Sequence, residues 1–389
     1  MEEKKLKKIL TSYNTLFFLW MSCALYTTAK NPFENNFLIF RQVFWHIINK
    51  LPLYSEYPQE YNDINLYGPL FGYIVAPFAI FPIWLGHLFW QIALTALLFG
   101  VIKIMDFTDK RKLFILWFCA HELLTALFLS QFNIAIAAII LLAFYFVEKE
   151  KDIWATLFIV IGTLTKLYGI IGLAFFFFSN HKMKFCISFW GWLLLLLILP
   201  MLISSPEYIW EQYQSWGETL LAKNDKNLFA PDENISLLGI VRKISGCESY
   251  SDLWLIIPGV VLFSIPYMRT NQYKNKGFRE TLLASVMMFV VLFSTGSESY
   301  GYITPLIGTI IWYTASSWKR GKWDMALLVF VFFLTSLSPS DLFPRILRET
   351  FVKPYSLKAL PVVVLWFKLC YEIITKDYEK NNNLVTSIQ

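Results

Sequence analysis

Two carboxylates lie in polar loops beside apolar segments and could act in acid–base chemistry. Asp63 comes shortly before Tyr67-Gly68-Pro69, and Glu298 lies in a short polar connection between two apolar runs. Either carboxylate could accept a proton from a hydroxyl nucleophile. A carboxylate at the edge of hydrocarbon is costly without a partner, which favours a functional role for Glu298. Asp63 could equally occupy a turn, and Glu298 could face bulk water as an ordinary hairpin residue.

A second group of residues could hold an anion or a sugar. Lys166 follows a short apolar run, and Arg242 follows a polar Asn-Ile-Ser motif. Ammonium and guanidinium groups both bind phosphate, although a lysine next to a membrane can instead extend to the interface. Sugar hydroxyls could be bound by nearby amides and hydroxyls, namely Gln131, Asn133, Asn234 and Ser236. Capping of helices is an equally good role for the two asparagines.

Metals, cofactors and nucleic acid are not predicted. No two of the four histidines share the spacing of metal ligands, and His121-Glu122 falls within an apolar run, where we expect a buried pair. The sequence has no phosphate-binding P-loop and no dinucleotide fingerprint. Short basic loops account for the net charge of +6, which gives no reason to propose nucleic acid as a partner.

The composition indicates a polytopic, all-helical membrane protein. Aromatic residues make up 18% of the 389 residues, charged residues only 16%, and the mean hydropathy is +0.49. So little polar surface cannot cover a soluble globule. We predict about twelve membrane spans, some of them shorter than the roughly 20 residues of a perpendicular helix: 14–30, 82–103, 113–130, 133–147, 153–165, 168–179, 185–203, 253–268, 280–296, 300–318, 324–340 and 359–375.

Basic residues set the predicted orientation. They concentrate in the N-terminal segment and in alternate short loops, so both termini are expected in the cytoplasm. Two long loops, 31–67 and 204–252, are then external. In the first loop, apolar residues recur at helical spacing over 37–48, which predicts a helix in the headgroup plane with Arg41, Gln42 and His46 turned away. Residues 68–81 should form an interfacial or broken helix.

A series of motifs resembles one family of enzymes. In chain order these motifs are Asn35-Asn36-Phe37, Leu53-Tyr54, Tyr67-Gly68-Pro69, Phe81-Pro82, Trp90, Ser130-Gln131-Phe132-Asn133, Lys166-Leu167-Tyr168-Gly169 and Asn234-Ile235-Ser236-Leu237-Leu238-Gly239. Each motif is weak by itself, but their order and spacing over most of the chain are similar to those of glycosyltransferase family 87, the DUF2029 group. That family belongs to the GT-C class of multispanning glycosyltransferases.

The resemblance implies a GT-C-like bundle that fills residues 1–389 as one domain in the inner (plasma) membrane. It implies transfer of a sugar, a mannose-like hexose or a pentose, from a polyprenyl-phosphate donor to a lipid-linked or cell-envelope glycan on the external face. Membrane lipid would surround the enzyme, and no cofactor is implied. Substrate contacts would come from Asn35, Asn36, Arg41, Tyr67, Gln131, Asn133, Lys166, Asn234, Ser236 and Arg242. Lys166 and Arg242 would hold the phosphate.

One departure from the family pattern leaves the catalytic base open. Asn35-Asn36 stands where the family usually has an aspartate, and an amide is a poor base at neutral pH. Asp63 or Glu298 would have to replace it, and Asp63 ranks first because it lies close to Tyr67 and to the predicted helix start at Pro69. Three other functions remain compatible with the sequence: a transporter or flippase for lipid-linked glycans, a polysaccharide polymerase or ligase, and an inactive GT-C relative that binds a glycan.

Overall fold

The computed structural model describes residues 11–379, which form helices and connecting loops without a β-strand. The basic N-terminal segment used for the orientation argument lies outside these residues. Each predicted span overlaps one or two helical elements of the structure. This agreement is expected, because an apolar run between two short polar loops limits where a helix can begin and end. The chain divides into two compact units.

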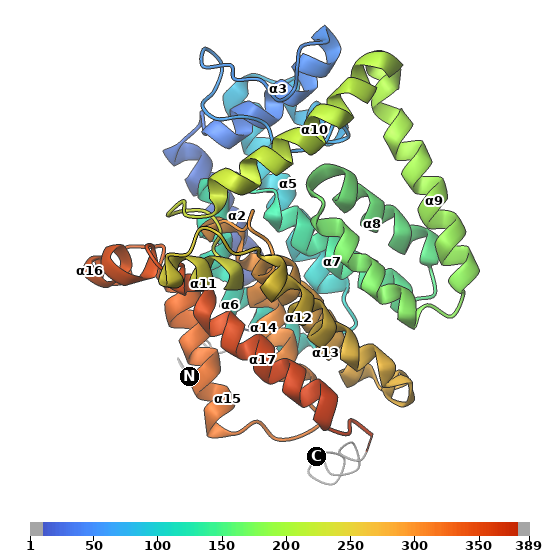
Figure 1. Cartoon of the computed structure of the whole chain (residues 1–389), viewed down its shortest axis with the longest axis vertical. Helices are drawn as coiled ribbons and strands as arrows, with labels where there is room; N and C mark the ends of the chain where they lie inside the picture. The colour runs from blue at the N-terminus through green and yellow to red at the C-terminus, as the bar shows by residue number, and fades with distance from the viewer. Residues whose placement is uncertain (1–10, 380–389) are drawn as a thin grey trace. The chain divides into compact units, whose positions relative to one another are not determined.

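Of the described residues, the first unit comprises 11–106 and 123–225. Its helices are α2 (Tyr13–Lys30), α3 (Asn35–Asn49), α4 (Phe71–Ala79), α5 (Ile83–Ile104), α7 (Asn133–Glu148), α8 (Asp152–Lys166), the 3-10 helix η1 (Tyr168–Phe178), α9 (Lys182–Ile198), the 3-10 helix η2 (Leu199–Ile203) and α10 (Pro206–Asn227). Figure 1 shows α9 and α10 meeting at an angle, with η2 between them. The short helix α4 corresponds to the broken helix predicted over 68–81.

Helix α3 confirms the predicted amphipathic helix but corrects its environment. Phe37, Phe40 and Ile47 are buried within the unit, and the Phe40 ring contacts that of Trp90 on α5. His46, predicted to turn away from the apolar face, is also buried, with its Nε2 2.8 Å from a carboxylate oxygen of Glu60. The prediction that this face lies against headgroups is therefore wrong, because protein from α4 and α5 already covers it.

Helix α10 forms several hydrogen bonds with the first long loop. The Tyr208 hydroxyl donates to the carbonyl of Leu51, the amide N–H of Leu53 donates to Gln212, and the Trp216 indole donates to the carbonyl of Leu66. Tyr208, Gln212 and Trp216 are four residues apart, so they share one face of the helix. The two loops predicted to be external are thus in direct contact within this unit.

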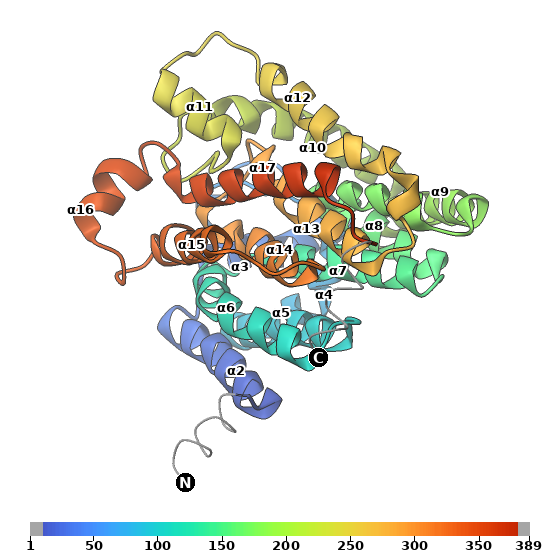
Figure 2. The same cartoon turned by 90° about the horizontal axis from the view of Figure 1, so that it is seen from below.

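Within the described part of the chain, the second unit comprises residues 107–122 and 226–379. Its elements are the first part of α6 (Asp109–Phe128), α11 (Leu237–Ser245), α12 (Leu253–Ser264), the 3-10 helices η3 (Ile265–Met268) and η4 (Thr270–Gln272), α13 (Lys276–Leu292), the 3-10 helix η5 (Ser299–Gly301), α14 (Ile303–Ala315), α15 (Lys322–Phe330), the π-helix η6 (Val331–Leu337), α16 (Arg345–Leu347), the π-helix η7 (Arg348–Val352), the 3-10 helix η8 (Leu357–Ala359) and α17 (Leu360–Thr375). Figure 2 shows α17 beside α14 and α15.

The apolar surface is compatible with a membrane protein. Two helical segments, 83–104 and 182–203, are long and apolar enough to cross a bilayer. Only 11% of the most apolar window of segment 182–203 is buried inside the structure, although its hydropathy is 2.4. Burying apolar surface away from water is worth about 25 cal/mol per Å², so this segment is far more stable against lipid than against water. The total number of crossings remains a prediction.

Candidate functional site

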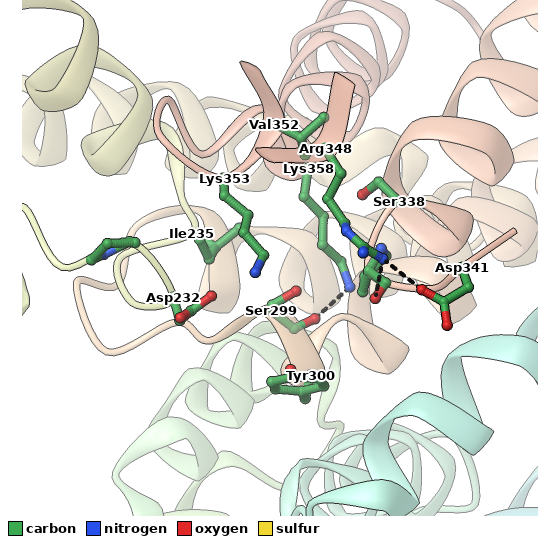
Figure 3. Close-up of a pocket in the computed structure, with 12 residues that line it drawn as sticks. Asp232, Ile235, Ser299, Tyr300, Ser338, Asp341, Arg348, Val352, Lys353 and Lys358 are labelled. Atoms are coloured by element: carbon green, nitrogen blue, oxygen red, sulfur yellow. Dashed lines mark hydrogen bonds and ion pairs between the residues drawn. The ribbon is translucent and has the colours of Figure 1, made fainter. Parts of the chain in front are cut away.

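A polar cavity of about 300 Å³ lies within the second unit (Figure 3). Its lining comes from four separate segments of the chain and includes three cations and two carboxylates. The lining residues are Pro231, Asp232, Ile235, Ser299, Tyr300, Ser338, Pro339, Asp341, Arg348, Val352, Lys353 and Lys358. Figure 3 shows the three basic side chains extending from one side toward Ser299 and Tyr300. Such a set of side chains can bind an anionic group.

The Asn-Ile-Ser motif shapes the first wall of the cavity. Asn234 has a positive φ of 51° and donates from its side chain to the carbonyl of Leu228. Ser236 caps α11 by accepting the N–H of Gly239 at 3.0 Å, and it donates to the Asn234 side chain at 2.7 Å. The N–H of Ile235 donates to the carbonyl of Ser297, which joins this wall to the second one. The motif therefore holds the loop that carries Asp232.

Lys243 on α11 also binds the loop 230–236. Its ammonium donates to the carbonyls of Ala230 and Glu233 and to the hydroxyl of Ser356. Burial lowers the pKa of Lys243 to about 8, and the nearby carboxylates only partly oppose this shift. The loop 230–236 is thus tied to α11 on one side and to Ser356 on the other.

Gly239→Ala should destabilise this wall. A Cβ at position 239 would lie 1.7 Å from the carbonyl oxygen of Asn234, so either the cap or the loop must move. Overpacking of this kind typically costs about 1–3 kcal/mol. Thermal unfolding in detergent should show a lower midpoint for this variant. Gly217→Ala is the matched control, because it is also inside a helix but its Cβ meets nothing within 4 Å; it should be neutral or slightly stabilising. Equal midpoints for the two variants would contradict the argument.

Lys358 lies at the base of the cavity in a buried ion pair. Its ammonium is 2.9 Å from a carboxylate oxygen of Glu122 on α6, and it also donates to the carbonyl of Ser299. Both side chains are almost completely buried. Burial lowers the pKa of Lys358, and the carboxylate of Glu122 opposes that change. The pair therefore places the Lys358 nitrogen beside the cavity despite its low exposure.

The other two cations come from the segment around η7. Arg348 lies 3.4 Å from Asp341 and donates to Glu349 at 3.0 Å, and Lys353 lies 3.4 Å from Glu349. Both carboxylates are well exposed to solvent. Exposed ion pairs are worth only about 0–1 kcal/mol, so an anionic ligand could replace these contacts at low cost.

Neutral donors and carboxylates complete the lining. The Ser338 hydroxyl is buried and has no hydrogen-bond partner within residues 11–379, which leaves it available to a ligand. Tyr300 also lines the cavity, and its phenol hydroxyl can donate a hydrogen bond to a ligand. Glu298 is half-buried and immediately precedes the lining residue Ser299. The segment that carries Ser299 and Tyr300 therefore also carries a carboxylate.

Four of the residues singled out from sequence belong to this unit. Glu298 and Asn234 directly precede the lining residues Ser299 and Ile235, and Ser236 supports the cavity wall as described above. Arg242 instead donates to the carbonyls of Cys247, Glu248 and Tyr250 and forms a 2.7 Å ion pair with Asp252. These contacts favour a role for Arg242 in holding the loop 247–252, and its contact with phosphate stays a prediction.

Asp63, Asn35 and Asn36 lie in the first unit. Asp63 has a positive φ of 73° and an exposed side chain, and it accepts the N–H of the next residue at 2.9 Å. The ammonium of Lys223 lies 3.9 Å from its carboxylate. Asn35 exchanges two hydrogen bonds with the backbone of Asn62, and the Asn36 side chain donates to the carbonyl of Leu129. These contacts favour turn and loop-anchoring roles, and none of them tests a contact with substrate.

The remaining predicted residues also lie in the first unit. Lys166 ends α8, and its ammonium is 5.5 Å from the ring of Tyr67, so the structure brings these two residues together. Asn133 donates to Gln131 at 2.9 Å, and both side chains are buried. Arg41 lies 5.8 Å from the Trp45 ring, and its buried Nε has no hydrogen-bond partner among the described residues.

Sequence reasoning missed most of the cavity. The sequence analysis did not single out five residues of the cavity and its surroundings as site candidates: Asp232, Arg348, Lys353, Lys358 and Glu122. One signal was present: the predicted external segment 341–358 holds four basic residues, which the positive-inside rule disfavours unless they have a function. A buried carboxylate was also missed in the first loop, where Glu34 caps α3 through the N–H of Phe37 and burial raises its pKa.

Comparison with known proteins agrees with the motifs. No curated protein matches the chain. Residues 65–295 match the model of glycosyltransferase family 87, and this range covers more than half of the chain. The matched range includes the Tyr-Gly-Pro, Ser-Gln-Phe-Asn and Asn-Ile-Ser motifs and the first wall of the cavity. The chain therefore belongs to glycosyltransferase family 87.

Proposed function

We propose that this glycosyltransferase moves a mannose-like hexose or a pentose from a polyprenyl phosphate to a lipid-linked or cell-envelope glycan. The transfer would occur on the external face of the inner membrane, where one GT-C-like domain of about twelve spans fills residues 1–389. The observation that carries the proposal is the cavity with its three cations. In the predicted threading, the lining residues lie in external loops or at the external ends of the spans 300–318 and 324–340.

In the proposed reaction, the bond between the anomeric carbon and the phosphate oxygen breaks. A hydroxyl oxygen of the acceptor forms the new bond to that carbon, and its proton passes to a carboxylate. Arg348, Lys353 and Lys358 would stabilise the negative charge that remains on the leaving polyprenyl phosphate. Glu298 is the preferred base because it adjoins the cavity, and Asp232 and Asp63 are the alternatives. Lys166 remains a candidate for holding the donor phosphate, and Tyr67 remains a candidate for a further contact with substrate.

The test uses purified protein in lipid nanodiscs. Polyprenyl-phosphate hexoses and pentoses and, as a comparison, nucleotide sugars are supplied with a glycolipid extract as acceptor. We expect release of polyprenyl phosphate and a labelled glycan with a polyprenyl donor, and no product with a nucleotide sugar. Labelled donor that crosses a liposome membrane without transfer would replace the proposal with a flippase, and binding without turnover would replace it with an inactive relative.

A further inference from the structure

The buried pair of Glu122 and Lys358 adjoins the cavity and is not explained by helix packing alone. Glu122 lies on α6 and Lys358 on η8, and the two residues are far apart in the sequence. Replacing such a pair with apolar residues is often neutral or stabilising, so stability is a weak reason for its presence. Its position at the cavity suggests a different reason.

Several contacts fix Lys358 in one place. The Thr335 hydroxyl donates to the carbonyl oxygen of Lys358 at 2.8 Å, which holds the backbone. The ammonium has three N–H groups; one binds Glu122 and one binds the carbonyl of Ser299. Because Lys358 lines the cavity, the third N–H can bind a ligand there. The Tyr302 ring, 5.0 Å from the ammonium, limits its movement on a further side.

We propose that Glu122 is a positioning residue that holds the Lys358 ammonium, charged and correctly directed, for the phosphate of the donor. This inference rests on the proposed function. Without a carboxylate at position 122, the buried lysine would lose its counter-charge and would either release its proton or turn away. Glu122 would then affect phosphate recognition only through Lys358, without touching the substrate.

The experiment compares the affinities of two probes, farnesyl phosphate and farnesol, for the full-length protein in detergent. The ratio of the two affinities measures how much the phosphate group contributes to binding. Lys358→Met should reduce the affinity for farnesyl phosphate about tenfold or more while leaving farnesol unchanged. Glu122→Gln should cause a similar loss. In a double-mutant cycle, adding Glu122→Gln to Lys358→Met should cause no further loss, because both residues act through one ammonium.

Glu280→Gln is the matched control. Glu280 is equally buried and also binds a residue of α6, Arg111, at 2.7 Å, but neither residue lines the cavity. It should affect stability without affecting the ratio of the two probes. Should Glu122→Gln not fold, Glu122→Asp keeps the charge but shortens the side chain, and it should weaken binding of farnesyl phosphate only.

The outcomes separate the inference from the proposed function. A wild-type protein that binds farnesyl phosphate no better than farnesol would overturn both. Wild-type preference for the phosphate, together with full affinity in the Glu122 variants or with independent effects in the double variant, would overturn only the inference. Equal losses in Glu280→Gln would also overturn it, because they would show a general effect of breaking a buried ion pair.

Discussion

Glu298→Gln is expected to lower kcat about 10²–10⁴-fold, the range that a general base usually contributes. The amide has nearly the shape of the carboxylate but cannot accept the proton of the acceptor hydroxyl. Glu298 is half-buried and adjoins the lining residues Ser299 and Tyr300. Binding of the donor should stay near the wild-type level, because the cations of the cavity are unchanged. Single-turnover kinetics with a polyprenyl-phosphate sugar would measure the chemical step directly.

Three further variants decide which carboxylate is the base. Glu248→Gln is the control for an amide replacement, since Glu248 is exposed and does not line the cavity. Asp63→Asn should retain most activity if its exposed turn position reflects a structural role. Asp232→Asn tests the carboxylate that lines the cavity directly. Full activity in Glu298→Gln with a large loss in either aspartate variant would transfer the role of base to that aspartate.

The helices could be predicted from the sequence because their signal is local. Apolar runs bounded by short polar loops indicate the approximate extent of each helix, and the predicted break between Lys166 and Tyr168 is the boundary of α8 and η1. The capping role considered for Asn234 was close to the observed one, since Ser236 caps α11 and Asn234 supports it. These features involve residues only a few positions apart.

The cavity could not be predicted in the same way because its residues come from distant segments. His121 and Glu122 were expected to pair, but adjacent residues on a helix point in different directions. Glu122 instead pairs with Lys358, and the His121 ring lies 3.2 Å from the Ser336 hydroxyl. Hydrophobic periodicity carries no information about such long-range contacts. The predicted environment of α3 was wrong for a related reason. Its apolar pattern suits packing against protein as well as against lipid.

Arg348→Met and Lys353→Met are each expected to raise the KM for the donor with a smaller change in kcat. A hydrogen bond to a charged group is worth about 1.5–3 kcal/mol. This corresponds to roughly 10–150-fold in affinity, at 1.4 kcal/mol for each factor of ten. Arg348→Lys should restore only part of the affinity, because an ammonium cannot bind two phosphate oxygens through a planar fork. Initial rates at varied donor concentration would separate the two kinetic constants.

Arg345→Met is the matched control for this prediction. Arg345 lies three residues before Arg348 on the same helical segment, but it is exposed and does not line the cavity. A general attraction between the basic segment and an anionic donor would make all three variants similar and would weaken with added salt. If the donor phosphate contacts Arg348 and Lys353 directly, Arg345→Met should have a KM near that of the wild type. Arg348→Met and Lys353→Met should then both lose affinity for the donor. An unchanged KM in both cavity variants would mean that the donor phosphate binds elsewhere, and the half-buried Arg41 and Lys166 would then be the residues to test.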